Sequence, residues 1–110
     1  MNTSDLVREI AATYERHGWT LRQVLLRPET KATIESASDL FRGAEVRDAD
    51  FDAVWFSRPS HAKREAWELR LISPQAYALF EAFEADEAEE DREEARREME
   101  NRMRQHVSKE

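Results

Sequence analysis

Positive charge gathers in one short polar stretch of the chain, residues 58–64, whose sequence is RPSHAKR. The side chains that supply it are Arg58, His61, Lys63 and Arg64. Guanidinium and ammonium groups bind phosphates and carboxylates through charge-assisted hydrogen bonds. This stretch is therefore our first candidate site, for an anion or for the acidic surface of a partner protein. The alternative is structural, because a solvated turn accepts Lys and Arg freely and charge there discourages edge pairing with other chains.

A second candidate lies in the charged C-terminal stretch, residues 84–110. Acids dominate its first part and basic residues its last part, which is the order that the helix dipole favours. On such a helix one side carries Ala88, Ala95, Met99 and Met103. This seam could pair with a second copy or with a partner helix. Because large apolar residues are scarce along it, a solvated helix is the alternative.

Catalytic and metal-binding patterns are weak. Ser57 and His61 lie close in sequence, but no Gly-x-Ser-x-Gly turn accompanies them, and the chain has two glycines in all. Asp48, Asp50 and Asp52 resemble the start of a calcium loop, yet the glycine and the final glutamate of that loop are missing. The three histidines are far apart. We predict no catalytic residue, no metal site and no cofactor.

Composition limits the other classes of function. The chain contains no cysteine, which excludes disulfides and thiolate metal sites. A net charge of −7 disfavours nucleic acid as a partner. No apolar run is long enough to cross a membrane and no signal peptide begins the chain, so we expect a cytoplasmic protein with no membrane partner.

The polar stretch 58–64 needs a support, and its flanks predict a β-hairpin. Aromatic and β-branched residues dominate the first arm, residues 51–57. The second arm, residues 65–72, alternates, with Trp67, Leu69 and Leu71 on one face. The sheet built on this hairpin is the centre of the predicted fold.

Helices and a further strand surround the hairpin. Residues 4–17 predict an amphipathic helix, capped by Thr3 or Ser4 and ended by Gly18. Residues 19–27 predict a strand, with a short helix as the alternative, because a capping box also fits there. A second helix is predicted from Pro28 to a stop at Gly43, and a third from Pro74.

The predicted fold is a two-layer α+β sandwich of order α-β-α-β-β-α, with a mixed three-stranded sheet and a long charged C-terminal helix. If the two are neighbours, the crossover places the first strand parallel to the strand that begins at residue 51. We divide the chain into one globular domain, residues 1–83, and a charged, partly exposed helical tail, residues 84–110.

Two classes of function remain. The first is a small non-enzymatic protein-interaction domain that uses the hairpin turn, the C-terminal tail or both, with another protein or a second copy as its partner. The alternative is a domain that binds a small molecule or an anion, with a minor enzymatic activity left open, in a pocket between sheet and helices. The aromatic residues that would line this pocket are Trp19, Trp55, Trp67 and Tyr77.

Overall fold

The fold is built on a hairpin of two long strands, β3 (Ala53–Pro59) and β4 (Glu65–Leu71), as the sequence predicts. The structure is a computed structural model that describes residues 2–34, 40–41 and 43–109. Trp67, Leu69 and Leu71 all lie in one buried cluster on one face of the sheet. The predicted alternation of β4 is therefore confirmed.

The sheet is larger than predicted: it has five strands in the order β2-β1-β3-β4-β5. The additional strands are β1 (Thr20–Leu26), β2 (Glu45–Asp48) and β5 (Ala78–Phe83). The expectation of three strands was wrong. Strand β1 is antiparallel to β3 and parallel to β2, so the predicted parallel pairing of the first strand with β3 was also wrong. The crossover through α2 (Pro28–Ile34) leads to β2, an edge strand too short to stand out in the sequence.

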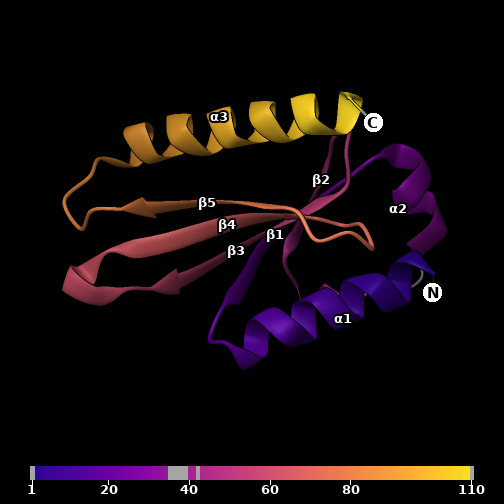
Figure 1. The fold of residues 1–110 in the computed structure, drawn as a ribbon, viewed down its shortest axis with the longest axis horizontal. Helices are drawn as coiled ribbons and strands as arrows, with labels where there is room; N and C mark the ends of the chain where they lie inside the picture. The colour runs from indigo at the N-terminus through magenta and orange to yellow at the C-terminus, as the bar shows by residue number, and fades with distance from the viewer. Residues whose placement is uncertain (1, 35–39, 42, 110) are drawn as a thin grey trace.

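Helices cover both faces of the sheet, so the architecture has three layers rather than the predicted two (Figure 1). Helix α1 (Thr3–Arg16) lies on one side and helix α3 (Glu89–Ser108) on the other. Adjacent residues of β3 point into different cores: Val54 and Phe56 pack with α1, whereas Ala53 and Trp55 pack with α3. Every residue from Ala53 to Ser57 is buried, as a strand covered on both faces requires.

Helix α1 begins one residue earlier than predicted. The side chain of Asn2 accepts a hydrogen bond from the backbone N–H of Asp5 over 2.8 Å, so Asn2 is the cap rather than Thr3 or Ser4. At the other end Gly18 adopts a positive φ of 85°, as predicted for the stop. Trp19 then folds back, and its ring lies 5.9 Å from that of Tyr14.

The predicted helix from Pro74 was wrong: residues 73–75 form bends, residues 76–77 have no regular secondary structure, and β5 follows. The apolar residues of this stretch also fit a period of two, with Leu79 and Phe83 buried toward α3. Pairing with the open side of β4 satisfies the backbone groups on one side of the strand. The second helix is described only as far as Ile34, and most of its predicted remainder lies outside the described residues.

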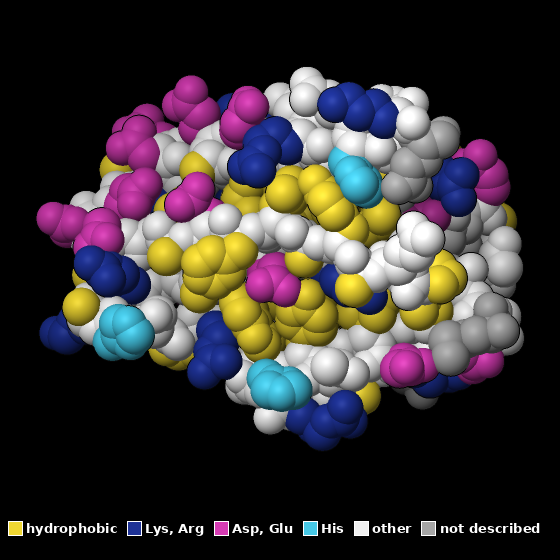
Figure 2. Space-filling view, in the orientation of Figure 1, with side chains coloured by type: hydrophobic (Ala, Val, Ile, Leu, Met, Phe, Trp, Pro, Cys, Tyr) yellow, Lys and Arg dark blue, Asp and Glu magenta, His cyan; other side chains and the backbone are white. Residues whose placement is uncertain are grey.

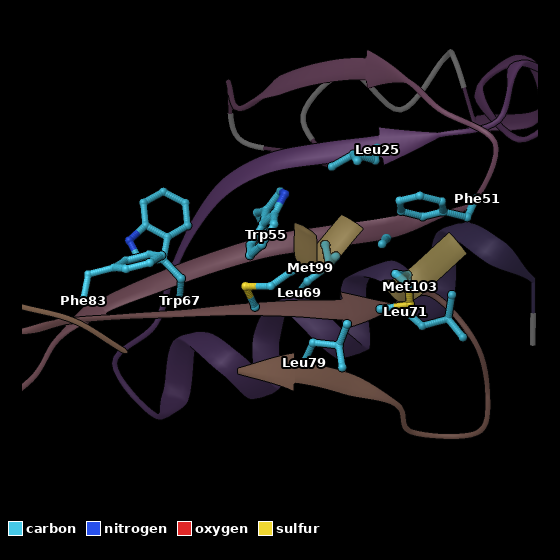
Figure 3. Packing of buried hydrophobic residues seen from close by; sticks show 11 residues of the cluster. Leu25, Phe51, Trp55, Trp67, Leu69, Leu71, Leu79, Phe83, Met99 and Met103 are labelled. Atoms are coloured by element: carbon cyan, nitrogen blue, oxygen red, sulfur yellow. The ribbon is translucent and has the colours of Figure 1, made fainter. Parts of the chain in front are cut away.

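Helix α3 packs on the sheet through few large side chains. Met99 and Met103 are 2% and 0% exposed, and they lie among Leu69, Leu71 and Phe51 (Figure 3). Residues on both sides of the predicted boundary at residue 83 therefore share one core. Within the described residues, no helix combines the length and the apolar character needed to cross a bilayer.

Candidate functional site

A groove opens where α3 does not cover the sheet. A helix is about 10 Å wide and neighbouring strands lie about 4.8 Å apart, so one helix covers about two strands. Helix α3 contacts β4 and β5. On the same face, part of β1 and β2 therefore stays open beside the helix.

The groove consists of two hollows that share Arg22. The first has a volume of about 360 Å³ and the second of about 400 Å³. We call the two together the arginine groove. The first hollow is lined by Arg22, Gln23, Arg47, Trp55, Trp67, Glu93, Arg96, Arg97 and Glu100. The second is lined by Thr20, Arg22, Ser57, Arg58, Pro59, Ser60, Lys63, Arg64, Glu65 and Arg92.

A β-bulge directs Arg22 into the groove. In the pairing of β1 with β3, Leu21 lies opposite Phe56 and Gln23 lies opposite Trp55, which leaves Arg22 as the extra residue. Simple alternation would place Arg22 on the α1 side with Val24. Instead its guanidinium lies 5.2 Å from the centre of the Trp67 ring, on the α3 side. Bulges commonly redirect a side chain in this way.

Trp67 forms the floor of the groove beneath two guanidinium groups. Arg96 of α3 lies over its ring at 4.5 Å, on the same indole that Arg22 contacts. Trp55 lies beside it, with 5.9 Å between the two ring centres (Figure 3). Cation–π contact holds both guanidinium groups over the ring, and the indole face itself satisfies none of their N–H donors. Arg96 donates to Glu89 over 2.6 Å, and Arg22 has a long contact of 3.5 Å with the hydroxyl of Ser57, so Arg22 keeps more of its donors open.

One carboxylate is already bound in the groove. Glu100 of α3 accepts a hydrogen bond from the indole N–H of Trp55 over 2.9 Å. Arg47 of β2 donates to the same oxygen over 2.6 Å. The donors of Arg47 and Trp55 can therefore bind an anionic oxygen that lies between a guanidinium and an indole N–H.

The cations of the groove fall into two groups. Arg47, Arg64, Arg92 and Arg96 each form an ion pair, with Glu100, Glu84, Glu65 and Glu89 respectively. Within the described part of the chain, no ion pair is formed by Arg22, Lys63 or Arg97. These three side chains are exposed, so they are free to bind an external anion.

The predicted cluster of the hairpin turn is only partly assembled. Lys63 and Arg64 reach the second hollow. Arg58 lines it as well, but its guanidinium donates to the carbonyl of His17 over 2.5 Å and lies over the Trp19 ring at 5.7 Å. Arg58 therefore holds the C-terminal end of α1, which is a structural role.

The remaining turn residue, His61, lies on the other side of the hairpin. It lines a separate hollow of about 460 Å³ together with Trp19 and Phe80. The aromatic pocket considered from the sequence is thus divided by the sheet: Trp55 and Trp67 lie on the α3 side, and Trp19 lies on the α1 side. Tyr77 packs on the α3 side as well, where its ring stacks on that of His106 of α3 with 3.5 Å between the ring centres.

The C-terminal seam is not brought to one open surface. Met99 and Met103 face the sheet and are buried. Ala95 is half-buried against the same core, and Ala88 is exposed at the start of α3.

The aspartates near residue 50 bind basic side chains. Asp52 accepts from Arg27 and from the hydroxyl of Thr30, over 3.1 and 2.8 Å. The hydrogen bond and the charge of Asp52 raise the pKa of Arg27. Asp50 accepts from Arg104 of α3 over 2.8 Å. These contacts hold α2 and α3 onto the sheet.

Sequence reasoning missed the arginines outside the turn. Arg22, Arg47, Arg96 and Arg97 come from β1, β2 and α3, and only the tertiary fold brings them together. Strict alternation along β1 would put Arg22 on the same face as Val24, and only the bulge places it on the α3 side. No match was found when the chain was compared with protein-family models, with curated proteins and with solved structures.

Proposed function

We propose that this protein is a non-enzymatic interaction domain whose arginine groove binds an acidic segment of a partner protein. The observation that carries the proposal is the bulge that turns Arg22 into the groove, where it forms no ion pair within the described residues. A bulge costs ladder hydrogen bonds, and here it exposes a cation over an indole.

The chemistry of the groove favours binding over catalysis. Arginine stays protonated throughout the physiological range, so it cannot act as a general base. Its planar fork of donors suits the bidentate recognition of carboxylates. The groove therefore provides charge and geometry for holding an anionic group, which an interaction domain requires.

The shape of the groove favours an extended ligand. Arg22 lines both hollows, and each is also lined by residues of α3, Arg92 in one and Glu93, Arg96, Arg97 and Glu100 in the other. A segment that carries several carboxylates could contact Arg22, Lys63 and Arg97 together, whereas one compact ion could not. The net charge of −7 repels any polyanion, and it repels a nucleic acid, which carries a charge at every phosphate, more than a segment whose carboxylates are spaced apart.

Fluorescence anisotropy with a labelled peptide of alternating glutamate and serine residues tests the proposal. Wild-type protein should bind the peptide, with an affinity that falls as salt is added. The double variant Arg22→Gln, Arg97→Gln should bind at least about tenfold more weakly and with a flatter salt dependence, because two charge-assisted contacts are lost.

The matched control is the double variant Arg8→Gln, Arg102→Gln, which removes the same charge from exposed positions of α1 and α3 outside the groove. It should bind like the wild type. Equal weakening in both double variants would mean that only net charge matters, and this would refute the groove. Tighter binding of a single-stranded oligonucleotide through Arg22 and Arg97 would replace the protein partner with a nucleic acid.

A further inference from the structure

Strand β5 forms an open edge of the sheet. It is the last strand in the order β2-β1-β3-β4-β5, so its outer side has no neighbour among the described residues. The other edge strand, β2, has four residues, three of them charged, a common protection against edge pairing. β5 is longer, has the sequence ALFEAF, and contains neither lysine nor proline.

The hydrogen-bond pattern shows which residues of β5 are open. The backbone N–H of Leu71 donates to the carbonyl of Tyr77 over 2.9 Å. Because this orientation alternates along an antiparallel strand, Leu79, Glu81 and Phe83 also bond to β4. The N–H and C=O groups of the intervening residues, Ala78, Phe80 and Ala82, must then point away from the sheet.

An exposed aromatic side chain marks the centre of this edge. The side chain of Phe80 is 58% exposed, whereas the other large hydrophobic side chains of the described residues are buried or half-buried. Its ring lies 6.5 Å from that of Trp19, edge to face. Figure 2 shows hydrophobic side chains gathered over β5, in a band between α3 and α1. An open strand edge with an apolar surface of this kind is a site for strand addition.

We propose that β5 pairs antiparallel with β5 of a second copy of the chain, with the two-fold axis at Phe80. In this register Phe80 lies opposite Phe80 of the second copy. Ala78 lies opposite Ala82 of the second copy, so that aromatic meets aromatic and small meets small. Each of these residues presents its open backbone groups to an equally open residue, as antiparallel pairing requires.

Two neighbouring registers also keep open residues opposite open residues. One pairs Phe80 with Ala78 of the second copy, and it would align only residues 78–80 of the two β5 strands instead of residues 78–82. The other would pair Phe80 with Ala82 of the second copy. It would also place Glu81 directly opposite Glu81 of the second copy, and like charges in that position are destabilising. With the axis at Phe80, Glu81 instead faces Leu79 of the second copy. Because β5 is complementary to itself in this register, we assign a second copy of the chain as the partner of its open edge.

Sedimentation equilibrium over a range of concentrations tests the pairing in the full-length protein. The wild type should shift toward twice the monomer mass as its concentration rises. Phe80→Lys places like charges across the axis, and Ala82→Pro removes an outward donor without touching the bonds to β4. Each variant should raise the dissociation constant at least about tenfold, Phe80→Lys because it removes the central aromatic contact and Ala82→Pro because it removes a backbone hydrogen bond between the two strands.

The matched control is Ala32→Lys, an exposed position on α2 that adds the same charge as Phe80→Lys. It should dimerise like the wild type. Circular dichroism checks that each variant is folded. If one of the two edge variants fails to fold, the other still tests the pairing. A wild type that stays monomeric at every concentration, or dimers that survive both edge variants, would overturn the proposal.

Cysteine cross-linking tests the register, since the natural chain has no cysteine. Opposed residues of a hydrogen-bonded pair lie about 5.5 Å apart, within reach of a disulfide. A mixture of Ala78→Cys and Ala82→Cys proteins should therefore cross-link on oxidation much faster than either protein alone. Cross-linking that is fastest in Ala82→Cys alone would contradict the axis at Phe80.

Discussion

Trp55 on β3 and Glu100 on α3 are joined by a hydrogen bond of 2.9 Å from the indole N–H to the carboxylate. Trp55 is 1% exposed, so its N–H has no access to bulk water and needs a partner within the fold. The same carboxylate accepts from Arg47 of β2. One side chain of α3 therefore fastens the helix to two strands that lie apart in the sheet, and it fixes the wall of the arginine groove.

Glu100→Ala should lower the free energy of unfolding by about 2 kcal/mol, because it leaves the buried indole N–H of Trp55 without an acceptor. Glu100→Gln should cost less, since an amide oxygen can still accept. Urea unfolding followed by tryptophan fluorescence measures both. Glu98→Ala, at an exposed position of α3, is the control and should change stability little. Equal effects of the variants at 98 and 100 would contradict the anchoring role.

Tyr14 should make stability fall at alkaline pH. Burial, together with the hydrogen bond that its hydroxyl donates to Glu68, raises the pKa of Tyr14. The folded protein then keeps a proton that the unfolded chain loses above the ordinary tyrosine pKa of about 10. This contribution is complete below that pH and is lost as the pH rises through the folded pKa. Stability measured by urea unfolding should therefore fall less steeply above about pH 10 in Tyr14→Phe than in the wild type. Parallel curves would exclude the contribution.

The hairpin turn stores backbone strain that substitution should relieve. Ala62 and Lys63 have φ values of 61° and 60°, in the left-handed region that suits Asn and Gly. Ala62→Asn should raise the free energy of unfolding by up to about 1 kcal/mol, because Asn tolerates this conformation better than Ala. Thermal and urea unfolding measure the gain, and Ala62→Val, a β-branched residue, should have the opposite effect. A loss of stability in Ala62→Asn would show that this conformation is not strained.

Arg58 and Lys63 should separate stability from binding. Arg58→Ala removes the donor to the His17 carbonyl and the contact with Trp19, so it should destabilise the fold by about 1 kcal/mol. Lys63→Ala removes an exposed cation from the arginine groove and should weaken binding of the acidic peptide while leaving stability nearly unchanged. Urea unfolding measures the stability of both variants, and fluorescence anisotropy measures their binding of the acidic peptide. Loss of stability in Lys63→Ala would assign that residue a structural role as well.

Salt should act on the two proposed interactions in opposite directions. Added salt screens the attraction between the arginine groove and an acidic peptide, so binding weakens. The two copies in a β5 dimer each carry a charge of −7, so screening their repulsion should strengthen dimerisation. Anisotropy and sedimentation in the same salt series measure the two effects. A dimer that dissociates on added salt would point to charge pairing rather than strand pairing.

Local patterns were enough to predict the elements whose sequence fits a single conformation. The alternation of Trp67, Leu69 and Leu71 predicts β4, and the aromatic residues beside it predict β3. The apolar stripe before Gly18 predicts α1, because Gly18 readily adopts the positive φ that ends the helix. Residues 78–83 fit a helix and a strand equally well, and the open side of β4 decided between them.

The sequence by itself determined the chemistry available to this protein: many arginines, three tryptophans, no cysteine and a hairpin with a basic turn. Only the tertiary structure decided where that chemistry lies. The bulge at Arg22 arises from the pairing of β1 with β3, and pairing between distant strands leaves no local signature. The open flank beside α3 likewise depends on which strands the helix covers, and that is set by packing among residues far apart in the chain.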